Sequence, residues 1–214
     1  AFLHFSKKKC RGVHNDRLKG ATRRMRRIRT APLPPRARRT LTEVAGVTAG
    51  IYGAEVTALP AESLESFRTA ALNAWWGARR KQRAPGVARA LLARSHRIDP
   101  RNAITYNRFM GLRRALIRRP HLREVFEEVW SLRRNSNDAQ VPGPVGLLYE
   151  EVQSLGWEWK NPWSFQRGNL PSVPLTGGPQ GWVAHEIRDA IKLKEYRTAA
   201  SARTTFKGLE MVLT

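Results

Sequence analysis

The sequence predicts an all-α protein: a basic helical bundle followed by a helical, tryptophan-rich C-terminal extension. Apolar residues recur at helical spacing in several segments, and prolines separate these segments from one another. No long segment alternates apolar and polar residues as a strand does. The chain has 214 residues, of which 41% are hydrophobic and seven are tryptophan. This is enough apolar material for a core, so a wholly disordered chain is not expected.

The first predicted helix runs from the candidate N-caps Asn15 and Asp16 to Thr30. Arginines cover almost all of its surface except for one narrow apolar stripe. The segment 32–35 (PLPP) must end this helix, because proline lacks an N–H and restricts the residue before it. A helix with an apolar face is expected to dock onto a core instead of remaining a basic tail. The stripe consists of Leu18, Ala21, Met25 and Ile28.

Six further segments have helical periodicity or helix-starting residues, and a short helix is expected at 87–94. The six are 36–56, 60–76, 99–118, 120–134, 144–155 and 182–203. In the second of them, Leu64, Phe67, Ala71 and Trp75 form an apolar stripe. The stretch before the last helix is expected to be irregular, with a possible short strand at 157–159 and another at 3–5. Its tryptophans are expected to hold it onto the helices; they are Trp157, Trp159 and Trp163.

A turn-rich segment divides the expected helices into two groups. We predict a basic N-terminal junction at 1–16, a helical domain at 17–134, a linker at 135–146 and a helical extension at 147–214. The chain begins at Ala1 without a signal-peptide pattern, and we interpret it as a fragment or a processed product.

Positive charge is concentrated near the N-terminus. The net charge is +22, and residues 1–40 hold 14 lysines and arginines against one acid, a net of +13. Such an excess destabilises a compact state unless a polyanion neutralises it, and nucleic acid is the expected polyanion. A solubilising face or a nuclear-localisation run is the simpler alternative. An anionic membrane is disfavoured because the arginine-rich part lacks the broad apolar face of an interfacial helix.

The candidate nucleic-acid-binding residues are basic side chains and one tryptophan that can stack on a base. They are Lys19, Arg23, Arg24, Arg26, Arg27, Arg29, Arg38, Arg39, Trp76, Arg79, Arg80 and Lys81.

Residues for catalysis or metal binding are not found in any recognised arrangement. The four aspartates are isolated, and the adjacent acids at 127–128 and 150–151 diverge on their helices, so we expect solvated faces there. The histidines lack metal-ligand spacing, and a single cysteine excludes an internal disulfide framework. We therefore expect no catalytic residue, metal or cofactor in this chain.

Several short motifs follow one another in a recognisable order. The first are Arg17-Leu18-x-x-Ala21, Arg29 with Leu33-Pro34, Ile51-Tyr52-Gly53-Ala54-Glu55, Leu64-x-x-Phe67-Arg68-x-Ala70 and Ala74-Trp75-Trp76-Gly77. Later come His96-Arg97-Ile98-Asp99-Pro100, Tyr106 with Arg113-Arg114, Leu155-Gly156-Trp157 and Trp182 with His185 and Arg188. Together they resemble the region C-terminal to the palm in reverse transcriptases of non-LTR (LINE-like) retrotransposons, including protist elements.

The resemblance implies a helical thumb and its C-terminal extension, lying beside the template–primer duplex. The whole protein would be an RNA-directed DNA polymerase. Its palm, which carries the Asp-Asp motif and binds Mg²⁺, would precede this chain. The sequence departs from the family at Phe2-Leu3-His4, where such enzymes carry glycine as the third residue. The implied partners are an RNA or DNA duplex, held by its phosphates, and the palm of the same polypeptide. The implied location is nuclear or cytoplasmic, and no membrane is expected.

Two other interpretations remain open. The first alternative is a basic structural protein of an RNA-rich assembly such as an organellar ribosome, with residues 1–40 threading through RNA. A complete enzyme of unknown type would need carboxylates or a nucleophile in an arrangement that the sequence does not show.

Overall fold

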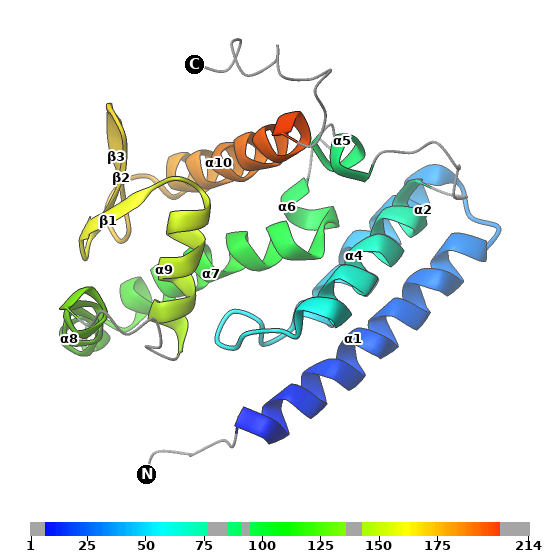
Figure 1. The fold of residues 1–214 in the computed structure, drawn as a ribbon, viewed down its shortest axis with the longest axis horizontal. Coiled ribbons are helices and arrows are strands. Elements are labelled where there is room, and N and C mark those ends of the chain that lie inside the picture. Colours follow the sequence, from blue (N-terminus) through cyan, green and yellow to red (C-terminus); the bar gives the residue numbers. More distant parts are fainter. Residues whose placement is uncertain (1–6, 77–84, 91–94, 136–142, 202–214) are drawn as a thin grey trace. The chain divides into compact units, whose positions relative to one another are not determined.

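A computed structural model describes residues 7–76, 85–90, 95–135 and 143–201, without the side chains of residues 7–11, 85 and 135. The described chain is mostly helical, as predicted, and contains a small three-stranded antiparallel sheet (Figure 1). The prediction of an all-α fold is therefore wrong in this one respect.

The chain forms two compact units. Unit 1 comprises residues 1–54 and 58–104, and unit 2 comprises residues 55–57 and 105–214. Most of the expected linker lies outside the described residues, so the domain boundaries predicted from the sequence stay a prediction.

Unit 1 is built around two long helices that lie side by side (Figure 1). Its elements are α1 (Lys7–Thr30), α2 (Pro35–Leu41), the π-helical η1 (Thr42–Val47), α3 (Thr48–Ile51), α4 (Ala61–Trp76), α5 (Pro85–Ala90), α6 (Ser95–Ile98) and the start of α7 (Pro100–Arg118). The predicted stripe of α1 is confirmed, because all four of its residues are buried in one cluster with Phe67 and Ala71 of α4. The helix thus has the apolar partner that its sequence requires.

Two predicted boundaries in unit 1 are wrong. Helix α1 begins at Lys7, so Asn15 is not an N-cap; its Oδ1 instead accepts a hydrogen bond from Ser63 Oγ at 2.7 Å. The helix expected at 36–56 changes to π-helical geometry at Thr42 and ends at Ile51. Beyond this end Gly53 has φ +82°, a left-handed conformation that glycine adopts without a steric penalty.

Asp99 begins α7, as the sequence predicts. Its Oδ1 accepts hydrogen bonds from the backbone N–H groups of Arg101 at 2.9 Å and Asn102 at 3.4 Å. These are two of the N–H groups that a helix leaves without an internal partner. The same carboxylate also binds the buried guanidinium of Arg68 on α4, a contact that the sequence did not predict.

Unit 2 contains the rest of α7, then α8 (Leu122–Asn135), α9 (Pro144–Ser154), the three strands and α10 (Gln180–Ser201). Strands β1 (Glu158–Asn161), β2 (Ser164–Arg167) and β3 (Leu170–Pro174) pair in that order, with Phe165 opposite Val173. Aromatic rings fill the core: Phe109 meets Phe165 edge-on at 5.2 Å between ring centroids. Trp157 and Trp159 are buried in the same cluster, which confirms that the tryptophans hold this region onto the helices.

Polar contacts fix the rest of unit 2. Trp163 Nε1 donates to Glu127 Oε1 of α8 at 2.6 Å. Glu151 of α9 accepts from Arg108 at 2.6 Å, so the prediction that the pair 150–151 only forms a solvated face is wrong for this residue. Arg113 is buried and donates to four carbonyls before α10, those of Pro174, Leu175, Gly177 and Gly178. Burial lowers the pKa of Arg113.

Candidate nucleic-acid interface

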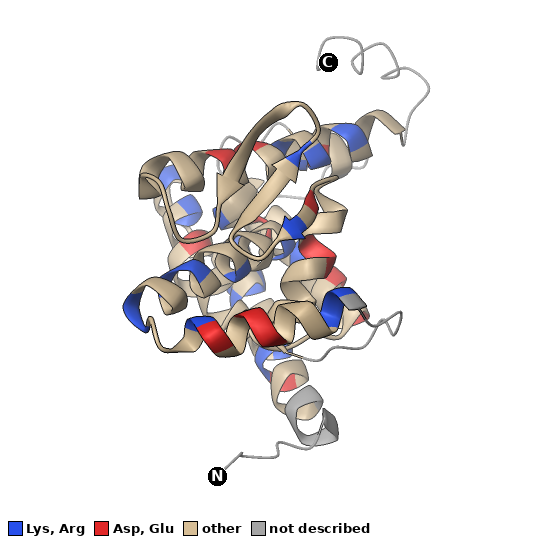
Figure 2. Cartoon of the chain, turned by 90° about the vertical axis from the view of Figure 1, so that its left-hand side faces the viewer, with Lys and Arg blue, Asp and Glu red and all other residues tan. Residues whose placement is uncertain are grey.

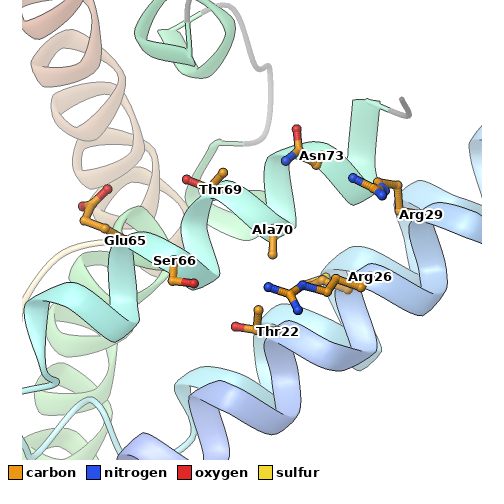
Figure 3. A pocket seen from close by; sticks show the side chains of 9 residues that line it. Thr22, Arg26, Arg29, Glu65, Ser66, Thr69, Ala70 and Asn73 are labelled. Carbon is orange, nitrogen blue, oxygen red and sulfur yellow. The ribbon is translucent and has the colours of Figure 1, made fainter. Parts of the chain in front are cut away.

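A groove runs along unit 1 between α1 and α4. It consists of two adjoining hollows of about 450 and 440 Å³ that share Thr22, Arg26 and Ser66 as lining residues. In Figure 3, Arg26 of α1 faces Ser66 and Ala70 of α4 across this gap. We call it the α1–α4 groove, and its two walls differ in chemistry.

The α1 wall is cationic. Its four basic residues are exposed, although only Arg26 belongs to both hollows. They recur every three or four positions and therefore share one flank of the helix. Burial of the apolar stripe fixes the rotation of α1 and so directs this flank toward the groove. At 1.5 Å per residue the wall is about 15 Å long. Its residues are Lys19, Arg23, Arg26 and Arg29.

The α4 wall is polar and largely uncharged. Hydroxyl and amide side chains recur on it every three or four residues. Serine, threonine and asparagine are weaker helix formers than alanine or glutamate, so the local helix does not favour them. Such side chains can donate hydrogen bonds to phosphate oxygens and do not form ion pairs with the arginines opposite, although the hydroxyl proton of Ser63 is donated to Asn15. The four residues are Ser63, Ser66, Thr69 and Asn73.

Two acids also line the groove, Glu62 and Glu65. Glu65 points away from α1 in Figure 3, and its Oε1 accepts from Arg68 Nη1 at 2.8 Å. Arg101 Nη1 lies 3.9 Å from the same oxygen. Glu65 is thus paired with arginines outside the α1 wall. The two acids therefore neutralise only part of the positive charge of the four basic residues of α1.

The remaining predicted arginines of α1 lie on its other flank. Arg24 Nη1 donates to the Ala45 carbonyl of η1 at 2.7 Å, and Arg27 is exposed three residues further along. The structure thus separates the five predicted arginines of α1 into three that line the groove and two on the other flank, of which Arg24 contacts η1.

The other predicted residues are near the C-terminal end of α4 or on α2. Arg38 Nη2 donates to the Leu33 carbonyl at 3.1 Å and so closes the proline turn. Arg39 is exposed, with its guanidinium carbon 4.6 Å from the centroid of the Trp75 ring. Trp76 is 45% exposed, as a stacking residue would have to be. Three predicted residues lie outside the described part of the chain: Arg79, Arg80 and Lys81.

Sequence reasoning missed the polar wall of α4. The signal was present, because the four polar residues recur at helical spacing beside the correctly predicted apolar stripe. Nothing local, however, indicates that these polar residues line a groove with the arginines of α1, which are more than 30 positions away in the sequence.

Within the residues that the structure describes, no three histidine, cysteine, aspartate or glutamate side chains gather closely enough to hold a metal ion. None of the described helices is long and apolar enough to cross a membrane.

Comparison with protein-family models, with curated proteins and with solved structures gives no match to this chain. The resemblance to retrotransposon reverse transcriptases is therefore carried by the short motifs alone.

Proposed function

We propose that this chain binds nucleic acid through the phosphates of its backbone, and that the α1–α4 groove holds one strand. The observation that carries the proposal is the pairing of a cationic wall with a wall rich in hydroxyl and amide side chains. Guanidinium groups match phosphate bidentately, and hydroxyl and amide donors commonly complete such contacts. None of these contacts requires a particular base, so we expect little sequence preference.

The length of the groove gives the number of phosphates that it can contact and so the expected salt dependence of binding. A wall of about 15 Å spans about four phosphates, because one strand of B-DNA carries a charge every 3.4 Å. Each neutralised phosphate contributes about −0.9 to the slope of log affinity against log salt on duplex DNA. The groove alone should therefore contribute a slope of about −3.6.

The motifs suggest which larger protein the chain belongs to. We propose the thumb and C-terminal extension of a retrotransposon-type reverse transcriptase, with the groove holding the template–primer duplex. The chain alone would be inactive, and the palm of the parent would supply the catalytic aspartates and Mg²⁺. The burial of the α1 stripe supports a docked helix of this kind.

A structural protein of an RNA-rich assembly is the second candidate. In that case residues 1–40 would be ordered only in the presence of RNA. Limited proteolysis of the free chain distinguishes the two candidates: protection of α1 is expected for a docked thumb helix, and early loss of residues 1–40 for an extension.

The direct test of nucleic-acid binding measures the fluorescence anisotropy of a labelled 20-base-pair RNA–DNA hybrid between 50 and 300 mM salt. The triple variant R23Q/R26Q/R29Q should weaken binding to all sequences alike and reduce the magnitude of the salt slope by about 2 to 3. The control R36Q/R97Q/R134Q removes the same charge from exposed arginines outside the groove. Equal effects of the two variants, or wild-type affinity that is independent of salt, would contradict the proposal.

A further inference from the structure

We propose that unit 2 carries a second phosphate-binding surface, at the turn between α7 and α8, with the backbone of a nucleic acid as its ligand. We call it the basic turn, and it does not depend on the α1–α4 groove. All four of its arginines are exposed, and none belongs to the residues expected from the sequence to bind nucleic acid. They are Arg114, Arg118, Arg119 and Arg123.

The turn brings these arginines together from two helices. Helix α7 ends at Arg118 and α8 begins at Leu122. The N–H of Leu122 donates to the Arg119 carbonyl, and the N–H of Arg123 to the Pro120 carbonyl, both at 3.0 Å. Figure 2 shows basic residues on both sides of this turn, and the acidic residues of α8 further along the helix.

Three other arginines of unit 2 are buried or half-buried and have partners within the unit. Arg108 forms an ion pair with Glu151 at 2.6 Å, and Arg167 forms one with Glu186. Arg113 donates to a set of backbone carbonyls. At the basic turn, among the residues that the structure describes, no ion pair joins an acid to any of the four arginines. Arg114 Nε donates to the Met110 carbonyl at 3.1 Å and Arg123 Nε to the Leu116 carbonyl at 3.4 Å. Since neutral carbonyls do not cancel a positive charge, the four charges remain available to an external anion.

Local stability does not account for this arrangement. A cation in the last turn of α7 is favourable, and this explains Arg118. Arg114 lies four residues before it, however, where two like charges repel. Arg123 lies at the start of α8, where the helix dipole disfavours positive charge, although Glu124 in the same turn partly offsets this. The cluster thus has unfavourable charge at two positions, Arg114 and Arg123, and a bound polyanion would remove this repulsion.

The chemistry favours nucleic acid over an anionic lipid surface. All four basic residues are arginine, whose planar guanidinium binds phosphate bidentately. An interfacial segment needs a broad apolar face to insert. Among the described residues in and next to the turn, two large hydrophobic side chains are substantially exposed, Ile117 and Val125, and two side chains do not form such a face. The neighbouring Trp163 is half-buried and held by its hydrogen bond to Glu127.

The test compares two double variants of the full chain, each made in the wild type and in the R23Q/R26Q/R29Q background. R118Q/R119Q removes two charges from the basic turn. R134Q/R197Q removes two charges from exposed arginines elsewhere in unit 2. Affinity for the 20-base-pair RNA–DNA hybrid is measured against salt, and binding to vesicles containing phosphatidylserine is measured in parallel. Circular dichroism and thermal unfolding check that each variant is folded.

We expect R118Q/R119Q to weaken hybrid binding by about tenfold or more at 50 mM salt and to reduce the magnitude of the salt slope by about 2, in both backgrounds. The control should change affinity by less than about threefold, a range compatible with the loss of general charge. Equal effects of the two double variants overturn the inference. A loss of vesicle binding with hybrid binding unchanged also overturns it, because the ligand would then be a lipid surface.

The basic-turn variant and the groove variant test the two surfaces independently. If the basic-turn variant weakens binding and the groove variant does not, the second surface stands and the groove proposal fails. The reverse result rejects only the second surface. A wild-type chain that does not bind the hybrid rejects both.

Discussion

The guanidinium of Arg68 and the carboxylate of Asp99 form a buried bidentate ion pair. Nε lies 2.9 Å from Oδ1, and Nη2 lies 2.8 Å from Oδ2. The residues are 6% and 4% exposed. Burial alone would lower the pKa of Arg68, but the charge of Asp99 and the hydrogen bonds to Asp99 and Glu65 outweigh burial and raise it. The pair therefore joins α4 to the first turn of α7 with both charges retained.

Removing one charge of this pair should be costly. Asp99→Asn keeps an N-cap residue for α7 but leaves the buried Arg68 guanidinium with only the half-exposed Glu65 as its counter-charge. We expect a loss of about 3–5 kcal/mol in the free energy of unfolding, measured by urea titration. The double variant R68M/D99N should lose much less than the sum of the two single variants, because it leaves no buried charge. Additive losses would contradict the coupling.

His14 should make the stability of unit 1 depend on pH. Burial, and next the charge of Arg17, lower its pKa below the unfolded value of 6.5. The unfolded state therefore takes up a proton more readily. The stabilising effect of neutral His14 is complete above pH 6.5 and decreases as the pH falls below it, by at most about 1.4 kcal/mol per pH unit.

Urea titrations at pH 5, 6, 7 and 8 measure this effect. His14→Gln should remove this component of the pH dependence of the free energy of unfolding, even if the substitution also changes that free energy at pH 8. Arg17→Gln should reduce it, because the nearby positive charge is lost. If the His14 variant keeps the full wild-type dependence between pH 5 and 7, the explanation is wrong.

Close packing against Gly50 should make this position intolerant of alanine. A Cβ there would lie 2.5 Å from Phe67 Cζ and 2.9 Å from Ala21 Cβ. We expect Gly50→Ala to lower the free energy of unfolding by about 1–3 kcal/mol, because overpacking outweighs the higher helix propensity of alanine.

Gly20→Ala is the matched control, since the position is exposed in the interior of α1 and a Cβ there would meet nothing within 4 Å. This variant should gain about 0.4–1 kcal/mol. A stabilised Gly50→Ala variant would show that the helices can separate at little cost.

Introducing acids on the polar wall of α4 should lower the affinity for nucleic acid without lowering the stability of the protein. In S66E/T69E, two carboxylates would face the α1 arginines, so stability should stay equal or rise by up to about 1 kcal/mol. Nucleic-acid affinity should fall by about tenfold or more, because the groove charge is neutralised. The control S66Q/T69Q has side chains of the same length without charge. Equal losses of affinity in both variants would show that shape, and not charge, is responsible.

Local sequence determined several features of this protein. Helical spacing and proline positions were sufficient for most helices, and the stripe from Leu18 to Ile28 was correctly predicted to be buried. These features depend on residues within a few turns of one another, which periodicity detects. The cationic flank of α1 follows from the same spacing.

Tertiary structure decided the features that need partners distant in sequence. The ion pair between Arg68 and Asp99 joins residues 31 positions apart. The role proposed for the polar wall of α4 depends on its lining the same groove as the arginines of α1. Of the sheet, only a possible strand at 157–159 was predicted, which overlaps β1. The other strands were missed because they have four or five residues, too few for a clear alternation, and become stable only by pairing and by burying Phe165 and Trp159. The tertiary fold, and not the helix preference of each segment, therefore places the basic residues of α1 beside the polar side chains of α4.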